Sequence, residues 1–520
     1  MNNSRVNKSI TNIKIGSIFF ILSLFLSFFS RKIFLENLGS EFLGLTGTLN
    51  SILSFLNLAE LGIGVSISYF LFEPIQKSNK EKICEILSVF GYLYNRIGIV
   101  IAIIGLLLSL SFPLIFNNSN IDIMIVYLSF YAFLGSSLIG YFINYRQILL
   151  SADQKNYIIS IYFQTFNIIK TALQIFIAYK FKNLYLWIIL EFVFSIIGCI
   201  FLNIRINKEY PWLKTSTEKG KEIINSYPEI LSKTKQVFIH RIKDFMLNKS
   251  DEILIFAFVS LKMVAFYGNY TMILNKIIYL INIISDGMGA GVGNLVAEGN
   301  KKNTIKVFWE LMALRFYIVG VVIFTLYLFV QTFIAIWLGK EYILNDLILY
   351  LLLFNLFIML SRGVVEMYIH SYGLFADVWV AWAELLINIS ITLIAGSLWG
   401  ITGILLGKII SSIFIAFFWK PYYLFKSGIK LHYSVYWKGI STYYFVFFIC
   451  IIFISPIKYY IIDLYVDNFI KLFIFAFVIL IPIIIIYFVM LFKVTEGMKY
   501  FVIRIPILSK ILNKLIKYEL

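Results

Sequence analysis

A run of polar residues interrupts the apolar stretch at 237–260. Its members recur at spacings of three, four and three residues, which places them on one face of a helix: Arg241, Asp244, Asn248 and Asp251. A charge at the centre of a bilayer costs about 2.5 to 3.5 kcal/mol, so such a face must contact the protein interior or a water-filled cavity. Acids and bases together could bind an anion or carry a proton or cation. The alternative is that the first two turns form an amphipathic extension in the cytoplasm.

Further ionisable residues lie in other apolar stretches, where each needs a partner or a watery cavity. Arg31 and Lys170 lie close enough to the ends of their stretches to reach the interface. Arg362 can neutralise Glu366, which follows one helical turn later. The basic candidates for binding a substrate are Arg31, Arg241, Lys243, Lys249 and Lys276, and the acidic candidates for ion coupling or cavity lining are Glu60, Asp244, Asp251 and Asp286.

Glu60 lies in the segment Leu58-Ala-Glu-Leu-Gly-Ile-Gly64. A carboxylate in apolar surroundings is stable only if it binds a cation, pairs with a base such as Arg31, or takes up a proton. Gly62 and Gly64 would let a neighbouring helix approach once the charge is neutralised. Two interpretations stay open: Glu60 couples cavity closure to proton or cation binding, or it is a static salt-bridge partner.

Apolar stretches of spanning length must position these residues. Of the 520 residues, 60 % are hydrophobic and only 14 % charged, whereas soluble domains have about 25 % charged residues. A helix needs about 20 apolar residues to cross a bilayer. The sequence therefore predicts an all-α polytopic membrane protein with about 14 transmembrane helices, at 13–35, 42–71, 88–116, 121–145, 157–179, 184–204, 237–260, 264–297, 308–336, 343–369, 376–396, 399–420, 440–457 and 469–492.

Basic residues are unevenly divided between alternate connections. A net charge of +17 would suggest nucleic acid for a soluble protein, but it is the usual bias of cytoplasmic loops in a membrane protein. With the N-terminus inside, the inner segments hold 27 Lys and Arg, whereas the outer side holds 7 when Arg31 and Lys32 at the end of the first stretch are included. We therefore expect both termini in the cytoplasm, a basic amphipathic tail at 493–520, and no nucleic-acid partner.

The sequence shows no pattern typical of a metal site, a cofactor site or a disulfide framework. Cys84, Cys199 and Cys450 lie singly in apolar surroundings, and the three histidines are scattered. The longest connections, 205–236 and 420–438, are both predicted to be cytoplasmic, and every external connection is short. We expect no bound cofactor or metal and no enzymatic activity.

An offset of 225 residues aligns part of the chain with itself. It spans six predicted helices, so both copies would keep the same orientation, which is typical of two bundles around a shared cavity. Chance similarity of glycine-rich helix ends is the alternative. The matched pairs are Asn50 with Asn275, Gly62 with Gly287, Gly64 with Gly289, Glu73 with Glu298 and Lys77 with Lys302. The predicted domains are a six-helix N-lobe at 1–204, a cytoplasmic linker at 205–236, a six-helix C-lobe at 237–420, two extra helices within 421–492 and the tail at 493–520.

Two groups of residues resemble a known family. One comprises Arg31, Leu38, Gly39, Glu41, Gly44, Leu45, Asn50, Ala59, Glu60, Gly62, Gly64, Tyr69 and Pro74, and the other comprises Asp251, Tyr267, Gly268, Asn269 and Tyr270. They are similar to bacterial polysaccharide-transporter flippases, the O-antigen and capsule-repeat exporters of the multidrug/oligosaccharidyl-lipid/polysaccharide superfamily. The detailed match covers about the first 300 residues. Phe72, Glu73 and Asn79 depart from it within a predicted cytoplasmic connection.

The resemblance implies a two-lobed flippase of the bacterial cytoplasmic (inner) membrane. Its substrate would be an undecaprenyl-diphosphate-linked oligosaccharide, moved by alternating access, with membrane lipids and the polysaccharide polymerase machinery as further partners. The thirteenth and fourteenth helices would lie outside the lobes and help to accommodate the lipid tail. The basic candidates would then hold the diphosphate, since phosphate needs fixed cations in a partly desolvated site.

Three other functions fit less well. An ion-coupled multidrug or small-solute exporter of the same fold favours a cavity dominated by acids, whereas the seventh predicted span mixes both signs. A polymerase or ligase would need a large external loop with catalytic Arg or His residues, and the external connections contain no His. A membrane scaffold needs no buried charges.

Overall fold

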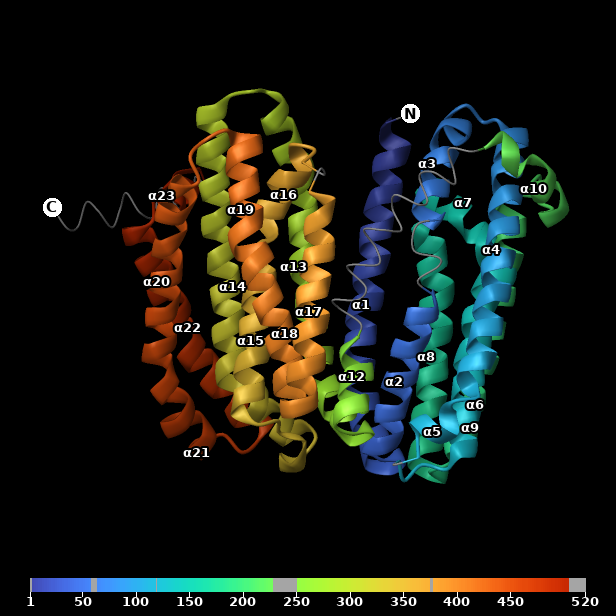
Figure 1. Ribbon diagram of the computed structural model, residues 1–520, viewed down its shortest axis with the longest axis horizontal. Helices are drawn as coiled ribbons and strands as arrows, with labels where there is room; N and C mark the ends of the chain where they lie inside the picture. The colour runs from blue at the N-terminus through green and yellow to red at the C-terminus, as the bar shows by residue number, and fades with distance from the viewer. Residues whose placement is uncertain (1, 58–62, 118, 228–249, 375–376, 505–520) are drawn as a thin grey trace. The chain divides into compact units, whose positions relative to one another are not determined.

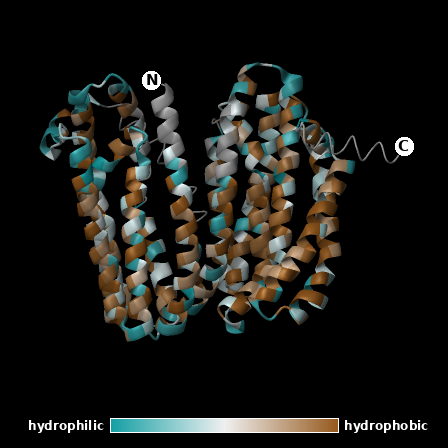
Figure 2. Ribbon diagram, turned by 180° about the vertical axis from the view of Figure 1, so that it is seen from behind, coloured by the Kyte–Doolittle hydropathy of each residue, from teal (hydrophilic) through white to brown (hydrophobic). Residues whose placement is uncertain are grey.

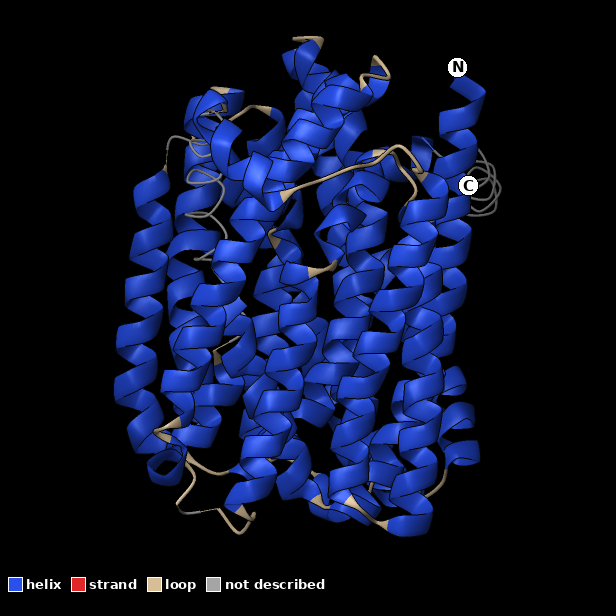
Figure 3. Ribbon diagram, turned by 90° about the vertical axis from the view of Figure 1, so that its right-hand side faces the viewer, coloured by secondary structure: helices blue, strands red, loops and turns tan. Residues whose placement is uncertain are grey.

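The computed structural model describes residues 2–57, 63–117, 119–227, 250–374 and 377–504. Regular structure in these residues is helical, and no strand occurs among them (Figure 3). Figure 2 shows hydrophobic residues along the lengths of the helices and hydrophilic residues mainly near their ends and connections. The prediction of an all-α polytopic membrane protein is confirmed.

Ten of the described helices are long and apolar enough to cross a membrane. They correspond to ten of the fourteen predicted spans, so the full number stays a prediction. The stretch at 157–179 forms a helix, but Asn167, Lys170 and Gln174 make it more polar than the ten. The helix at 264–297 likewise carries Lys276 and Asp286. The stretches at 42–71 and 237–260 extend beyond the described residues.

The described chain forms two compact units, Met1–Gly268 and Asn269–Leu520, so the division falls within helix α13. In the first unit, α1 packs on α8, α8 on α9, and α6 on both α4 and α9 (Figure 1). Its elements are α1 (Asn2–Leu38), α2 (Ser40–Leu56), α3 (Ile63–Gln76), α4 (Lys80–Ser109), α5 (Phe112–Ile115), α6 (Ile123–Phe142), η2 (Asn144–Arg146), α7 (Gln147–Ala152), α8 (Asn156–Phe181), α9 (Leu184–Glu209), α10 (Thr217–Ile223), η3 (Ile224–Ser226), α12 (Asp251–Phe258) and the start of α13 (Leu261–Ala297).

The second unit is built around α14, which packs against α15, α20, α22 and α23, while α17 packs on α18. The segments η5, η6 and η7 are π-helical. The elements are α14 (Lys301–Trp337), η4 (Lys340–Tyr342), α15 (Asp346–Ser361), α16 (Gly363–Ser371), α17 (Val378–Trp399), α18 (Ile401–Ser412), η5 (Ile413–Trp419), α19 (Lys420–Tyr423), η6 (Leu424–Ile429), α20 (Ser434–Ile457), η7 (Lys458–Ile462), α21 (Asp463–Tyr465), α22 (Phe469–Val494) and α23 (Glu496–Arg504).

Asn and Asp side chains cap helices in both units. The side chain of Asn79 accepts a hydrogen bond from the N–H of Lys82 at the start of α4, and Asn300 accepts one from the N–H of Asn303 at the start of α14. Such caps satisfy backbone donors that the helix itself leaves unpaired. Asp122 and Asn345 likewise cap α6 and α15. The internal duplication inferred from the aligned residues stays a prediction.

The first part of the predicted linker packs on the first unit. The N–H of Ser216 donates to the hydroxyl of Ser88 at 3.2 Å, and the hydroxyl of Tyr227 donates to the carboxylate of Glu85 at 2.8 Å. Burial and the neighbouring Glu85 raise the pKa of Tyr227 to about 12. The chain from Trp212 to Tyr227 therefore packs against α4.

Glycines of α18 and of α13 differ in how closely other atoms approach them. A Cβ atom at Gly403 or Gly407 would overlap atoms of α17, so these glycines allow a close approach of the two helices. At Gly289, Gly291 and Gly293 an added Cβ would meet no described atom within 4 Å.

Candidate functional site

Three of the nine predicted site residues have described side chains. Arg31 lies in α1, Asp251 begins α12, and Lys276 lies half-buried in α13. Asp286 also lies in α13, but its side chain is outside the described part of the chain. The other five predicted residues also fall outside it: Glu60, Arg241, Lys243, Asp244 and Lys249.

Arg31 binds the backbone at the start of α13. Its Nη2 donates a hydrogen bond to the carbonyl oxygen of Ala265 at 2.9 Å. A Cβ atom at Gly268 would lie only 3.0 Å from the same Nη2, so glycine leaves room for the guanidinium there. Arg31 therefore joins α1 to α13 within the first unit, which is a structural role that the sequence did not predict.

Asp251 and Glu252 join α12 to its neighbours. The Asp251 side chain is 7 % exposed and accepts a hydrogen bond from the hydroxyl of Tyr267 at 2.6 Å. Glu252 accepts one from the hydroxyl of Ser51 in α2 at 2.7 Å. Both acids lie in the first turn of α12, where the helix dipole stabilises negative charge. Sequence reasoning missed Glu252 and Ser51, because nothing local relates the two positions.

The same cluster explains part of the family-like segment. Tyr267 donates to Asp251, and Gly268 makes space for Arg31, so two adjacent residues each contact one charged side chain. Tyr270 belongs to the second unit, where its hydroxyl accepts a hydrogen bond from the N–H of Leu344 at 3.0 Å. These residues hold helices together through their contacts with charged side chains and backbone groups.

Buried charges of the second unit also have partners. The Nε of Arg315 donates to the carbonyl oxygen of Leu360 at 2.6 Å. Arg362 pairs with Glu366 at 3.0 Å, as predicted, and its Nη1 also lies 3.8 Å from a carboxylate oxygen of the buried Glu384. The long-range pair with Glu384 joins the start of α16 to α17.

A polar and aromatic cavity of about 460 Å³ lies within the first unit. The side-chain oxygen of Gln147 is buried and has no hydrogen-bond partner among the described residues. Aromatic faces beside amide and hydroxyl groups are suited to a polar ring such as a sugar. The lining comes from α3, α4, η2, α7 and α8 and includes Gly64, Ser68, Phe90, Tyr94, Tyr145, Gln147, Ser151, Asn156 and Phe163.

An apolar cavity of about 450 Å³ lies within the second unit, between α14, α15, α20 and η7. The hydroxyls of Tyr350 and Tyr459 hydrogen-bond to each other in its wall. An apolar chain could occupy this space because the rest of the wall consists mainly of aliphatic and aromatic groups: Ile323, Tyr327, Leu353, Phe354, Phe357, Phe447, Phe448 and Ile451. Neither cavity was predicted, since each is lined by residues far apart in the sequence.

No group of His, Cys, Asp and Glu that could hold a metal ion occurs within the described ranges. Cys199 is buried, and its thiol lies 3.1 Å from the side-chain oxygen of Asn144. Asn203 donates to that same oxygen at 2.7 Å. This small polar network joins α9 to η2.

Solved transporter structures share this fold. The lipid II flippase MurJ in an inward closed conformation aligns with a TM-score of 0.66 and 14 % identity, covering 92 % of this chain and 98 % of that one. An inward-facing MATE multidrug transporter of the MOP superfamily aligns with a TM-score of 0.53 and 15 % identity, covering 76 % and 93 %. A Vibrio cholerae MATE transporter aligns at 0.50 and 13 %, covering 82 % and 99 %.

No protein-family model and no curated protein sequence matches the chain. At such low identity, the structural similarity establishes the fold alone. The neighbours are transporters and flippases. The chain therefore has the fold of multi-pass MOP-superfamily transporters.

Proposed function

We propose that this chain is a flippase that moves an undecaprenyl-diphosphate-linked oligosaccharide across the bacterial cytoplasmic membrane for surface-polysaccharide biosynthesis. The extent of the fold is the observation that carries the proposal. The lipid II flippase covers more of this chain than either multidrug transporter does. Two lobes, at 1–204 and 237–420, would alternate between inward and outward access, with α20 and α22 outside them.

The cavities of the two units suit different parts of such a substrate. The polar, aromatic cavity beside Gln147 fits a sugar, and the apolar cavity beside α20 fits an isoprenoid tail. A diphosphate would require cations, for which the basic candidates in α1, in α13 and at 241–249 are proposed. No step needs nucleotide hydrolysis, so an ion gradient or the membrane potential would supply the energy.

The direct test is a chromosomal deletion followed by mass analysis of diphosphate-linked glycolipids. The deletion should accumulate a lipid-linked repeat unit and lose the surface glycan, and the plasmid-borne gene should reverse both effects. As a matched control, a deletion of the first glycosyltransferase should lose the glycan without accumulating the lipid. A strain that keeps its glycan and accumulates no glycolipid would overturn the proposal.

A second candidate function is ion-coupled export of drugs or other small solutes, which the MATE structures favour. Export of a cationic dye from energised cells separates the two functions. A flippase should leave dye accumulation the same in the deletion and parent strains. A drug exporter should lower the accumulation only when the gene is present.

A further inference from the structure

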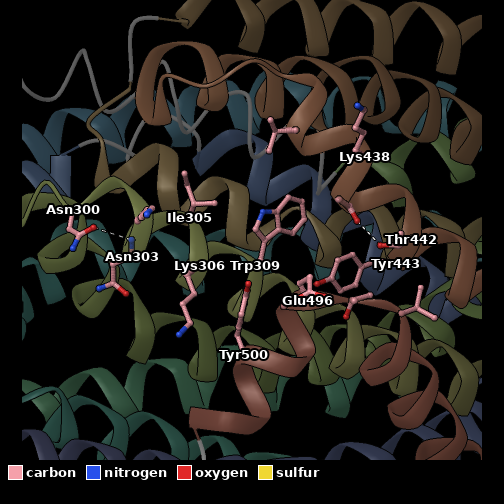
Figure 4. Close-up of a pocket in the computed structure, with 16 residues that line it drawn as sticks. Asn300, Asn303, Ile305, Lys306, Trp309, Lys438, Thr442, Tyr443, Glu496 and Tyr500 are labelled. Atoms are coloured by element: carbon pink, nitrogen blue, oxygen red, sulfur yellow. Dashed lines mark hydrogen bonds between the residues drawn. The ribbon is translucent and has the colours of Figure 1, made fainter.

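A large cavity lies at the start of α14 in the second unit. Its volume is about 980 Å³, and its walls come from the first turns of α14, α20 and α23 together with the end of α22. Figure 4 shows these side chains. Lys302, Lys306 and Lys438 line it alongside Trp309, Tyr443 and Tyr500. It lies away from the apolar cavity, with which it shares no lining residue.

The lysines of this cavity make no ion pair among the described residues, although Lys306 interacts with the charge of Glu310, which itself pairs with Arg504. Lys306 also lies 5.1 Å from the centre of the Tyr500 ring. Glu496 is the one acid in the lining, and it lies 2.9 Å from Lys499. The cavity therefore carries a local excess of positive charge.

The backbone adds to this positive potential. Three helices, α14, α20 and α23, begin at the cavity, and each presents the positive end of its dipole there. The protein's own side chains compensate part of this potential. The side chain of Asn300 caps α14 by accepting a hydrogen bond from the N–H of Asn303 at 3.1 Å. An anionic group in the cavity would interact with both the lysines and the helix ends.

Part of the cavity lining is apolar. Val435 and Val494 line it and are 38 % and 50 % exposed. Val494 ends α22, an apolar helix of 26 residues, so the chain leaves its hydrophobic segment at this level. Trp and Tyr are typical of membrane helices where hydrocarbon meets headgroups, and Trp309, Tyr443 and Tyr500 lie together here (Figure 4). An anion bound at this boundary between hydrocarbon and headgroups would be the headgroup of a lipid with acyl chains.

The chain's own C-terminal segment is a poor occupant by charge. Residues 505–520 contain Lys510, Lys514 and Lys517 but only one acid, Glu519. Like charges would repel this segment from a lysine-lined cavity.

We propose that the cavity binds the phosphate headgroup of an anionic phospholipid, as a resident lipid distinct from any transported substrate. The lysines and helix ends hold the phosphate, and the acyl chains lie along the exposed apolar ends of α20 and α22. This binding does not depend on the proposed flippase activity, because it uses the membrane lipids themselves.

Native mass spectrometry of the purified full-length chain tests this. The protein is titrated with phosphatidylglycerol or with zwitterionic phosphatidylcholine of the same acyl chains. The Lys302→Gln, Lys306→Gln and Lys438→Gln triple variant should bind phosphatidylglycerol at least about tenfold more weakly, because each cation near a lipid surface contributes measurably. Phosphatidylcholine binding should not change.

Two further variants keep the test specific. Replacing the same three lysines by arginine should retain binding, which separates loss of charge from misfolding. Neutralising Lys340, Lys426 and Lys471, which do not line the cavity, should leave binding within about twofold of wild type. Equal phosphatidylglycerol binding by wild type and the cavity glutamine variant would overturn the proposal. Displacement of the lipid by millimolar inorganic phosphate would also overturn it, in favour of a free-anion site.

Discussion

The hydrogen bond from Tyr267 to Asp251 offsets part of the cost of burying that carboxylate. Hydrogen bonds to charged groups contribute about 1.5 to 3 kcal/mol, and this one is 2.6 Å long. The Tyr267→Phe variant should therefore be about 2 kcal/mol less stable, measured as a lower thermal unfolding midpoint in detergent. Tyr460, which is 73 % exposed, supplies the control. Equal midpoints for Tyr267→Phe and Tyr460→Phe would show that the bond contributes nothing.

Lys155 lies between two carboxylates near the start of α8. Its Nζ is 2.6 Å from Asp153 and 2.9 Å from Glu209. Burial alone would lower the pKa of Lys155, but hydrogen bonds and charge attraction from both acids outweigh it and raise the pKa. The charge therefore stabilises the fold fully below the ordinary pKa of 10.5, and this contribution is lost only as the pH rises through the higher folded-state value.

Removing that charge should be costly at neutral pH. We expect Lys155→Met to lower the free energy of unfolding by about 2 kcal/mol, independently of pH between 6 and 8. The matched control is Lys77→Met, which breaks an ion pair with Glu73 whose side chains are 70 % and 69 % exposed. Such exposed pairs contribute about 0 to 1 kcal/mol. Similar losses for both variants would contradict the argument.

At the scale of elements, Gly403 determines how closely α18 packs on α17. A Cβ there would overlap the backbone of Ala395, which cannot rotate away as a side chain could. Gly403→Ala should destabilise the protein by about 1 to 3 kcal/mol and lower the yield of monodisperse protein. Gly293→Ala is the control, since a Cβ there meets no described atom within 4 Å. If Gly403→Ala purified as well as Gly293→Ala, this view of the contact would be wrong.

For the whole molecule, the distribution of Lys and Arg predicts which connections face the cytoplasm. The native cysteines are first replaced. Lys219→Cys then places a single thiol at an exposed position within α10, and Asp467→Cys places one just before α22. A membrane-impermeant maleimide should label Asp467→Cys in intact cells, and label Lys219→Cys only after permeabilisation. The opposite pattern would invert the predicted orientation.

Coupling to an ion gradient is also a property of the whole molecule, for which Glu60 is the sequence-based candidate. In proteoliposomes, Glu60→Gln should lose gradient-driven transport of the lipid-linked oligosaccharide while still binding it. Glu73→Gln, which removes an exposed carboxylate, should transport normally. Unchanged transport by Glu60→Gln would support a static role for this residue.

The sequence by itself determined the features that depend on local patterns. Apolar stretches predicted helices such as α14 and α22, because membrane insertion depends on the hydrophobicity of about 20 consecutive residues. The Arg362–Glu366 pair was also predicted, since positions four apart share a helix face.

Only the tertiary structure decided which distant residues meet. Arg31 binds Ala265, and Ser51 binds Glu252, across more than 200 positions of the chain. The cavities are likewise lined by several helices, so no periodicity in one segment indicates them. The physical reason is that a single sequence specifies which faces are polar or apolar, whereas packing selects the partner of each face.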